Sequence, residues 1–98
     1  MPIRHVACFR FRPGTTSDQV EAMTEGLLTL PSVIPQIAEY RIGPDLKLND
    51  DSWDFCVIAD FTDTADYRAY QANPEHQRLI ATLVKPILAE RASVQYWT

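Results

Sequence analysis

The fold is decided by an alternating stretch close to the N-terminus, Ile3-Arg4-His5-Val6-Ala7-Cys8-Phe9-Arg10-Phe11-Arg12. Successive side chains of a β-strand point to opposite faces of its sheet. One face of this stretch would carry Ile3, His5, Ala7, Phe9 and Phe11, and the other would carry Val6 and Cys8 between arginines. We therefore predict a strand over residues 3–12 with apolar side chains on both faces.

The rest of the chain reads as alternating helices and strands. Thr16 or Ser17 can cap a helix of about 13 residues, whose apolar stripe ends at Pro31 and Pro35. Further strands are expected over residues 37–42, 55–61 and 92–97. A short helix should end near Ala72, and Asn73-Pro74 should then start a third helix that Pro86 bends or interrupts.

The element order, β-α-β-β-α-α-β, predicts an α+β fold of one domain over residues 1–98. Its form would be a ferredoxin-like two-layer sandwich, with a four-stranded antiparallel sheet and all helices on one face. The length of 98 residues leaves no room for a second core, and 46% hydrophobic with 22% charged residues is ordinary for a folded domain.

The second face of the predicted sheet needs a cover. Helices can cover only one face, yet Val6, Cys8, Cys56 and Ile58 alternate onto the other. An exposed apolar patch of this kind usually marks an interface, so we expect a homodimer packed sheet to sheet as a dimeric α+β barrel. The alternative is a monomer with a few exposed apolar residues. Cys8 and Cys56 should be reduced, buried thiols on neighbouring strands.

Composition excludes several classes of partner. A formal charge of −4 argues against nucleic acid and anionic membranes, and no apolar run approaches the length of a bilayer span. The N-terminal stretch lacks the apolar core of a signal peptide, so a cytoplasmic protein is the default expectation. Two distant cysteines, two histidines on different elements and three glycines make no zinc, nucleotide or dinucleotide motif. We expect no metal and no cofactor.

Both histidines, His5 and His76, fall on the layer between sheet and helices. His76 would lie near a helix N-terminus, where the partial positive charge disfavours imidazolium, and Tyr70 could present a phenol beside it. We predict a cleft for a small, largely apolar ligand in this layer. Its floor would be His5, Phe9, Phe55 and Val57, and its roof would be Met23, Leu27, Tyr70, Leu79 and Leu83. The simpler alternative is that His76 and Tyr70 only pack in the core.

Three stretches carry a resemblance to a known family. They are Ile3-Arg4-His5-Val6 with Phe9-Arg10-Phe11-Arg12-Pro13-Gly14, then Ile34-Pro35, then Tyr70-Gln71-Ala72-Asn73-Pro74-Glu75-His76-Gln77. The chain resembles the stress-responsive dimeric α/β-barrel (Dabb) family over essentially its whole length. The resemblance implies a ferredoxin-like protomer whose sheets pair in a dimer.

The same resemblance implies roles for particular residues. In a plant polyketide cyclase of this family that needs no cofactor, a tyrosine and a histidine form an acid-base pair, and these match Tyr70 and His76. A histidine of the first strand matches His5. The chain departs from that cyclase at Asn73 and Phe55, where the cyclase has histidines. These departures make the predicted pocket more apolar.

The sequence therefore leaves three alternative functions open. The first is a stress-responsive barrel protein that binds a small apolar ligand without turnover. The second is a cofactor-independent lyase, cyclase or isomerase that acts on a small, polyketide-like carbonyl compound, with His76 as base and Tyr70 as acid or oxyanion donor. The third is a purely structural dimer, which would have a filled core and no pocket joining His76 and Tyr70.

Overall fold

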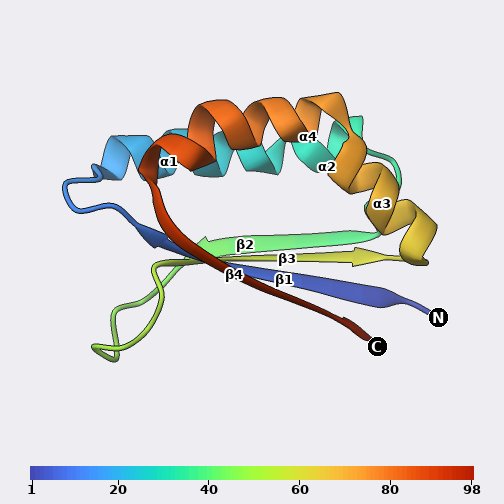
Figure 1. Ribbon diagram of the computed structural model, residues 1–98, viewed down its shortest axis with the longest axis horizontal. Helices are drawn as coiled ribbons and strands as arrows, with labels where there is room; N and C mark the ends of the chain where they lie inside the picture. Colours follow the sequence, from blue (N-terminus) through green and yellow to red (C-terminus); the bar gives the residue numbers. More distant parts are fainter.

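A four-stranded antiparallel sheet carries all of the helices on one face (Figure 1). The computed structural model describes residues 1–98. Its elements are β1 (Ile3–Phe11), α1 (Ser17–Leu28), α2 (Leu30–Val33), β2 (Glu39–Pro44), β3 (Phe55–Phe61), α3 (Thr64–Ala72), α4 (Pro74–Leu79), a π-helical turn (Ile80–Val84), a 3-10 turn (Lys85–Ile87) and β4 (Leu88–Trp97). The fold is the predicted ferredoxin-like α+β sandwich.

Strand β1 lies inside the sheet, whose order is β2-β3-β1-β4. It pairs antiparallel with β3 on one side and with β4 on the other, so His5 stands between Ala59 and Gln95. Arg4 and Asp60 lie opposite each other on the outer face and form a two-pronged ion pair, at 2.8 and 2.9 Å. Charge-assisted pairs of this geometry are directional, so this one helps to hold the register of β1 against β3.

The core fills the space between the helices and the inner face of the sheet. The buried apolar residues of the sheet are Ile3, Ala7, Phe9, Phe55, Val57, Ala59 and Phe61. They meet helix-layer side chains at Met23, Leu27, Leu30, Ile34, Leu79, Val84 and Ile87. The alternation of β1 and β3 thus assigned their inner faces correctly, and burial of these apolar side chains stabilises the two-layer arrangement.

Helix starts follow the capping residues that the sequence offers. The Thr16 hydroxyl accepts a hydrogen bond from the Gln19 N–H while the Gln19 side chain accepts one from the Thr16 N–H, which is a complete capping box. Asn73 caps α4, because its side-chain oxygen accepts hydrogen bonds from the backbone N–H groups of Glu75 and His76. Pro74 follows in the first turn, where a missing N–H costs nothing.

Helix α1 approaches the π-helical turn closely at Gly26. A Cβ atom at this position would collide with the Leu83 side chain and press against Leu79. The absence of a side chain therefore lets Leu83 pack over α1 rather than over the sheet.

Two strand boundaries differ from the sequence prediction. Strand β2 begins at Glu39 rather than residue 37, because Ile37 is still held in a turn by its hydrogen bond to Ile34. It extends to Pro44, which an edge strand tolerates since one side of that strand has no ladder to complete.

Strand β4 begins at Leu88, four residues before the predicted start. Pro86 cannot donate a backbone hydrogen bond, and the helix gives way to the π-helical turn and then to the 3-10 turn, as the position of this proline predicts. The chain then enters the sheet immediately after the 3-10 turn, and Leu88 pairs with Phe11 and Arg91 with Phe9. Leu88 is therefore the first residue of the last strand.

No helix covers the outer face of the sheet, and only the loop between β2 and β3 extends to that side (Figure 1). Val6, Cys8, Cys56 and Ile58 are half-buried there, and Val94 and Tyr96 of β4 are more exposed. Cys8 lies directly opposite Cys56, and both thiols are free. Burial, with the Cys8 thiol as a second cause, raises the pKa of Cys56 to about 11. No helix in the structure has the length and apolarity needed to cross a bilayer.

We predict that Ile58→Glu disrupts association through this face. A carboxylate on a dry sheet-to-sheet interface would lose several kcal/mol of solvation, so the variant should sediment as a monomer or fail to fold. The matched control is Leu28→Glu, because Leu28 is an exposed apolar residue on α1, away from the outer face of the sheet. This variant should sediment as the unmodified protein does. Sedimentation velocity at micromolar concentration measures both. A dimeric Ile58→Glu protein would show that this face is not the interface.

Candidate functional site

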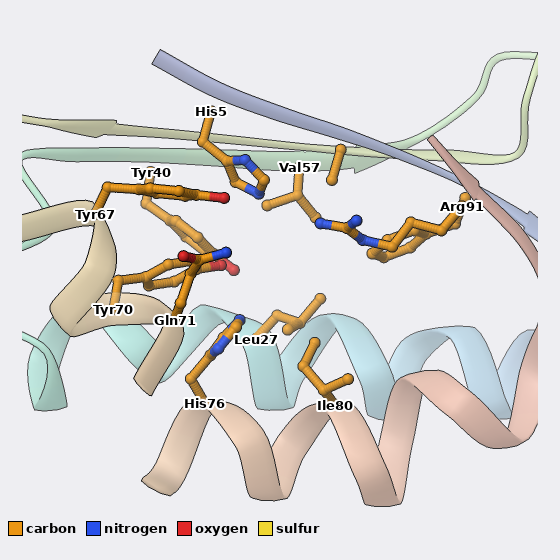
Figure 2. A pocket seen from close by; sticks show the side chains of 12 residues that line it. His5, Leu27, Tyr40, Val57, Tyr67, Tyr70, Gln71, His76, Ile80 and Arg91 are labelled. Atoms are coloured by element: carbon orange, nitrogen blue, oxygen red, sulfur yellow. The ribbon is translucent and has the colours of Figure 1, made fainter. Parts of the chain in front are cut away.

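A cavity of about 180 Å³ lies between the helix layer and the inner face of the sheet (Figure 2). It is open on one side and mostly apolar, with a few polar groups that converge on it. The lining residues are His5, Ala7, Phe9, Leu27, Tyr40, Val57, Tyr67, Tyr70, Gln71, His76, Ile80 and Arg91. Concave apolar sites with a few polar groups are the usual form of small-molecule sites.

The floor of the cavity comes from the central strands. Alternation along β1 points His5, Ala7 and Phe9 inward, and Val57 of β3 is the register partner of Ala7. Ala7 is the small residue among them, and its short side chain leaves the space that larger neighbours surround. The His5 residue is buried, with 4% of its surface exposed.

The junction of α3 and α4 brings Tyr70 against His76. Asn73 ends α3 and caps α4, so the chain turns sharply between the two residues. Their ring centroids lie 4.1 Å apart at an interplanar angle of 38°. The His5 ring lies 6.1 Å from Tyr70 and 5.2 Å from Tyr67, which extends the aromatic cluster to the sheet.

Two buried polar atoms at the cavity have no hydrogen-bond partner. One is Nδ1 of His76, and the other is the hydroxyl of Tyr40, whose side chain points toward the same part of the cavity as the Tyr70 phenol (Figure 2). An unpaired buried polar atom costs about 1–3 kcal/mol, which is why most are satisfied. Their presence on one cavity wall indicates a place where a polar ligand group would be stabilised.

Both imidazoles are held in the neutral form. Burial lowers the pKa of His5 to about 4, with further lowering by the charge of Arg91. Burial also lowers the pKa of His76, again with a contribution from Arg91, while the Gln71 carbonyl acts in the opposite direction. The Gln95 side-chain nitrogen lies 2.8 Å from His5 Nδ1. When this amide donates, Nδ1 accepts and the proton of His5 resides on Nε2.

The phenols are held protonated by the same burial. Desolvation raises the pKa of Tyr70 to about 12, while the Arg91 charge works against this rise. Burial, and secondarily the Tyr70 phenol, raise the pKa of Tyr40 above its usual range. At neutral pH the cavity therefore combines neutral imidazoles, which can accept a proton, with phenols that can donate a hydrogen bond.

The structure brings together six of the residues expected at the cleft: His5, Phe9, Leu27, Val57, Tyr70 and His76. Four others do not line it. Met23 and Phe55 are core residues with 0% and 2% of their surface exposed, and Phe55 stacks on Phe9 with centroids 6.1 Å apart. Leu79 is buried in the core and Leu83 packs toward Gly26. Periodicity gives the face on which a side chain lies but not its depth, so it could not separate these four from the lining.

Sequence reasoning missed six lining residues: Ala7, Tyr40, Tyr67, Gln71, Ile80 and Arg91. Tyr67 and Ile80 had a usable signal, because they stand three residues before Tyr70 and four after His76 on the same helical faces. Tyr40 pairs with Ala59 across the sheet and so shares the inner face. Arg91 was missed because the last strand was expected to begin one residue after it.

No group of three or more His, Cys, Asp or Glu side chains is arranged to hold a metal ion. The polar groups at the cavity are the two imidazoles, the phenols, the Gln71 side chain and the Arg91 guanidinium. These groups can accept or donate protons and hydrogen bonds, and Arg91 can bind an anion.

The fold and this cavity define a ferredoxin-like α+β domain with a hollow between its layers. The model of the stress-responsive A/B barrel domain (Dabb) matches residues 3–98. The chain belongs to that family. No functionally curated protein matches the sequence.

Solved structures extend the comparison. A dimeric ferredoxin-like protein of unknown function from Thermobifida fusca is 41% identical, with a TM-score of 0.93 over 100% of this chain and 92% of that one. A Dabb family protein from Mesorhizobium loti has a TM-score of 0.83 at 18% identity, covering 99% and 96%. The hydroxynitrile lyase from Passiflora edulis has a TM-score of 0.84 at 18% identity, covering 97% and 91%. The Thermobifida protein is described as dimeric, which supports a homodimer for this chain.

We predict that His5 makes the free energy of unfolding depend on pH at values above those at which Asp and Glu side chains titrate. Its pKa in the folded state, about 4, lies below the unfolded value of about 6.5, so the unfolded chain binds the proton first as pH falls. Stability is therefore present at neutral pH and is lost on acidification, by about 2 kcal/mol between about pH 7.5 and pH 5.

Urea unfolding at these two pH values, at one protein concentration, measures this loss. His5→Asn keeps an acceptor for Gln95 without a titrating ring, so its loss of stability should be smaller by about 2 kcal/mol. Acidic groups with lowered pKa values are present in both proteins, so their contribution to the loss of stability cancels when the two losses are subtracted. Equal losses in the two proteins would contradict a neutral, buried His5.

Proposed function

We propose that the protein binds a small, largely apolar molecule in the cavity between helices and sheet, with His5, Tyr70 and His76 as its polar contacts. The observation that carries the proposal is the unpartnered Nδ1 atom of His76, buried at a cavity that also presents the Tyr70 phenol. A ligand group that hydrogen-bonds to this atom, by donating to it or by accepting from it in the Nδ1–H tautomer, would remove the cost of leaving it unpaired. The cavity also argues against a purely structural dimer, for which a filled core was expected.

The volume limits the size of the ligand. A cavity of about 150 Å³ lined by aliphatic and aromatic side chains takes up benzene. The 180 Å³ cavity here is of similar size and is open on one side. A single ring or a short branched chain with one polar substituent fits these dimensions.

We predict that filling the cavity abolishes binding. Ala7→Leu adds three carbon atoms to the floor, where Ala7 is 3% exposed, and should displace the ligand at a stability cost of about 1–3 kcal/mol. Acetophenone is a suitable neutral probe, because it is one ring with a carbonyl group. Binding is measured by the NMR shifts of the two imidazoles, which are the only ones in the chain.

The matched control is Ala81→Leu, since Ala81 is exposed on the π-helical turn and does not line the cavity. It should bind acetophenone as the unmodified protein does. Retained binding by folded Ala7→Leu would contradict the proposed site.

The second candidate function is a cofactor-independent lyase, cyclase or isomerase acting on a small carbonyl compound. His76 would accept the proton from the carbon next to the carbonyl, and the electron pair of the broken C–H bond would become the enolate. Tyr70 would donate a hydrogen bond to the enolate oxygen. This alternative is favoured by the depressed pKa of His76, which buried surroundings keep as free base at neutral pH.

The fold comparison gives this alternative limited support. One protein of the same fold is a hydroxynitrile lyase, but at 18% identity the likeness concerns the fold. The resemblance of Tyr70 and His76 to the acid-base pair of a family cyclase supports it more directly. Asn73 and Phe55, which replace histidines of that cyclase, argue for a different and more apolar substrate.

We predict proton exchange as the minimal reaction of this second function. In D₂O, the protein should speed deuterium incorporation into the methyl group of acetophenone, as followed by NMR. His76→Ala should abolish the acceleration while leaving dimer and fold intact. Tyr70→Phe should slow it by roughly 10²–10⁴-fold, the usual contribution of a positioned acid, and largely spare binding. Binding without acceleration would leave the ligand-binding function and reject the catalytic one.

A further inference from the structure

Arg91 reaches the cavity from the edge strand β4. Its register partner is Phe9, so its side chain leaves the sheet on the helix side, as Gln95 does opposite His5. In Figure 2 the guanidinium extends from β4 toward the centre of the cavity, between Val57 above and Ile80 below. It is one of the twelve lining residues and their only formal charge at neutral pH.

The guanidinium has no carboxylate partner. Its one side-chain hydrogen bond goes to the Ser93 hydroxyl at 3.3 Å, which is long for such a contact. Four other cations of the chain form ion pairs, namely Arg4 with Asp60, Arg41 with Glu39, Lys47 with Asp54 and Arg78 with Glu75, and Arg91 is not among them. No Asp or Glu lines the cavity, although the protein carries a net charge of −4. The cavity is thus locally positive in an acidic protein.

The charge of Arg91 acts on the polar groups at the opposite wall. It lowers the pKa values of His5 and His76 and works against the rise in the pKa of Tyr70. These three groups line the same cavity as Arg91. Because no Asp or Glu lines the cavity and both histidines are neutral, Arg91 and an anion bound to it would be the only charges there.

We propose that Arg91 is the anion-binding residue of the cavity, and that the ligands are small apolar monocarboxylates of about one ring in size. This inference rests on the proposed ligand-binding function and names its ligand class. The fork of guanidinium N–H groups matches the two oxygens of a carboxylate. The apolar body of the ligand would then lie against Leu27, Val57 and Ile80, with its far end toward Tyr70 and His76.

The test compares an acid with its neutral isostere. Phenylacetate and phenylacetamide have nearly the same shape, but only the first carries a charge at neutral pH. The unmodified protein should bind phenylacetate at least tenfold more tightly, since hydrogen bonds to charged groups are worth more than neutral ones. Arg91→Gln should remove that preference, while its affinity for phenylacetamide should change less than twofold.

The matched control is Lys85→Gln. Lys85 is exposed on the 3-10 turn and does not line the cavity, so this variant loses the same charge without touching the site. Its preference for phenylacetate should equal that of the unmodified protein. Titration calorimetry gives the affinities, and the imidazole NMR signals of His5 and His76 report whether each probe enters the cavity.

The outcomes separate the two proposals. If both probes bind with equal affinity, and Arg91→Gln changes neither, the ligand-binding function stands and the role of Arg91 is rejected. Binding of neither probe to the unmodified protein would overturn both. A loss of phenylacetate preference in Lys85→Gln as large as in Arg91→Gln would show that net charge, rather than Arg91, selects the acid.

Discussion

The whole arrangement depends on the pairing of β1 along both of its edges. A strand paired with β3 on one side and β4 on the other cannot slip by one residue without breaking two ladders. Such a slip would move His5, Ala7 and Phe9 to the outer face and bring Val6 and Cys8 inward. The double pairing therefore fixes the core and the floor of the cavity at once, and every helix is positioned against that floor.

The residues of the candidate site are brought together in two ways, by a local turn of the chain and by packing of the sheet against the helices. Tyr70 and His76 are close because Asn73 and Pro74 turn the chain locally, so their contact depends on a seven-residue segment. His5 meets them only because the sheet packs under the helices. Burial then gives both histidines and Tyr70 their protonation states, and the same desolvation that stabilises the neutral rings leaves Nδ1 of His76 without a partner.

The strands β1 and β3, the capping box of α1 and the Asn73 cap were predictable, because each depends on residues near to one another in sequence. The cavity was less so. His5, Tyr70 and His76 followed from alternation and from a family motif, whereas Met23 and Phe55 were placed at the cavity although they lie in the packed core. How deeply a side chain is buried depends on how the sheet and the helix layer pack together, and sequence periodicity does not predict that packing. Arg91 was missed because Pro86 redirects the chain onto the sheet earlier than the alternation after Ala92 indicates.

Strand β4 is bonded on one side only, and nearly all of its residues are exposed within one chain. It nevertheless carries the groups that tune the site, Arg91 with its charge and Gln95 beside His5 Nδ1. The shape of the cavity is thus built mainly from the interior of the domain, while its one formal charge comes from an edge strand. A substitution at Arg91 can therefore change the charge of the hollow without changing the core residues that give it its shape, so charge selectivity and folding stability can be altered separately.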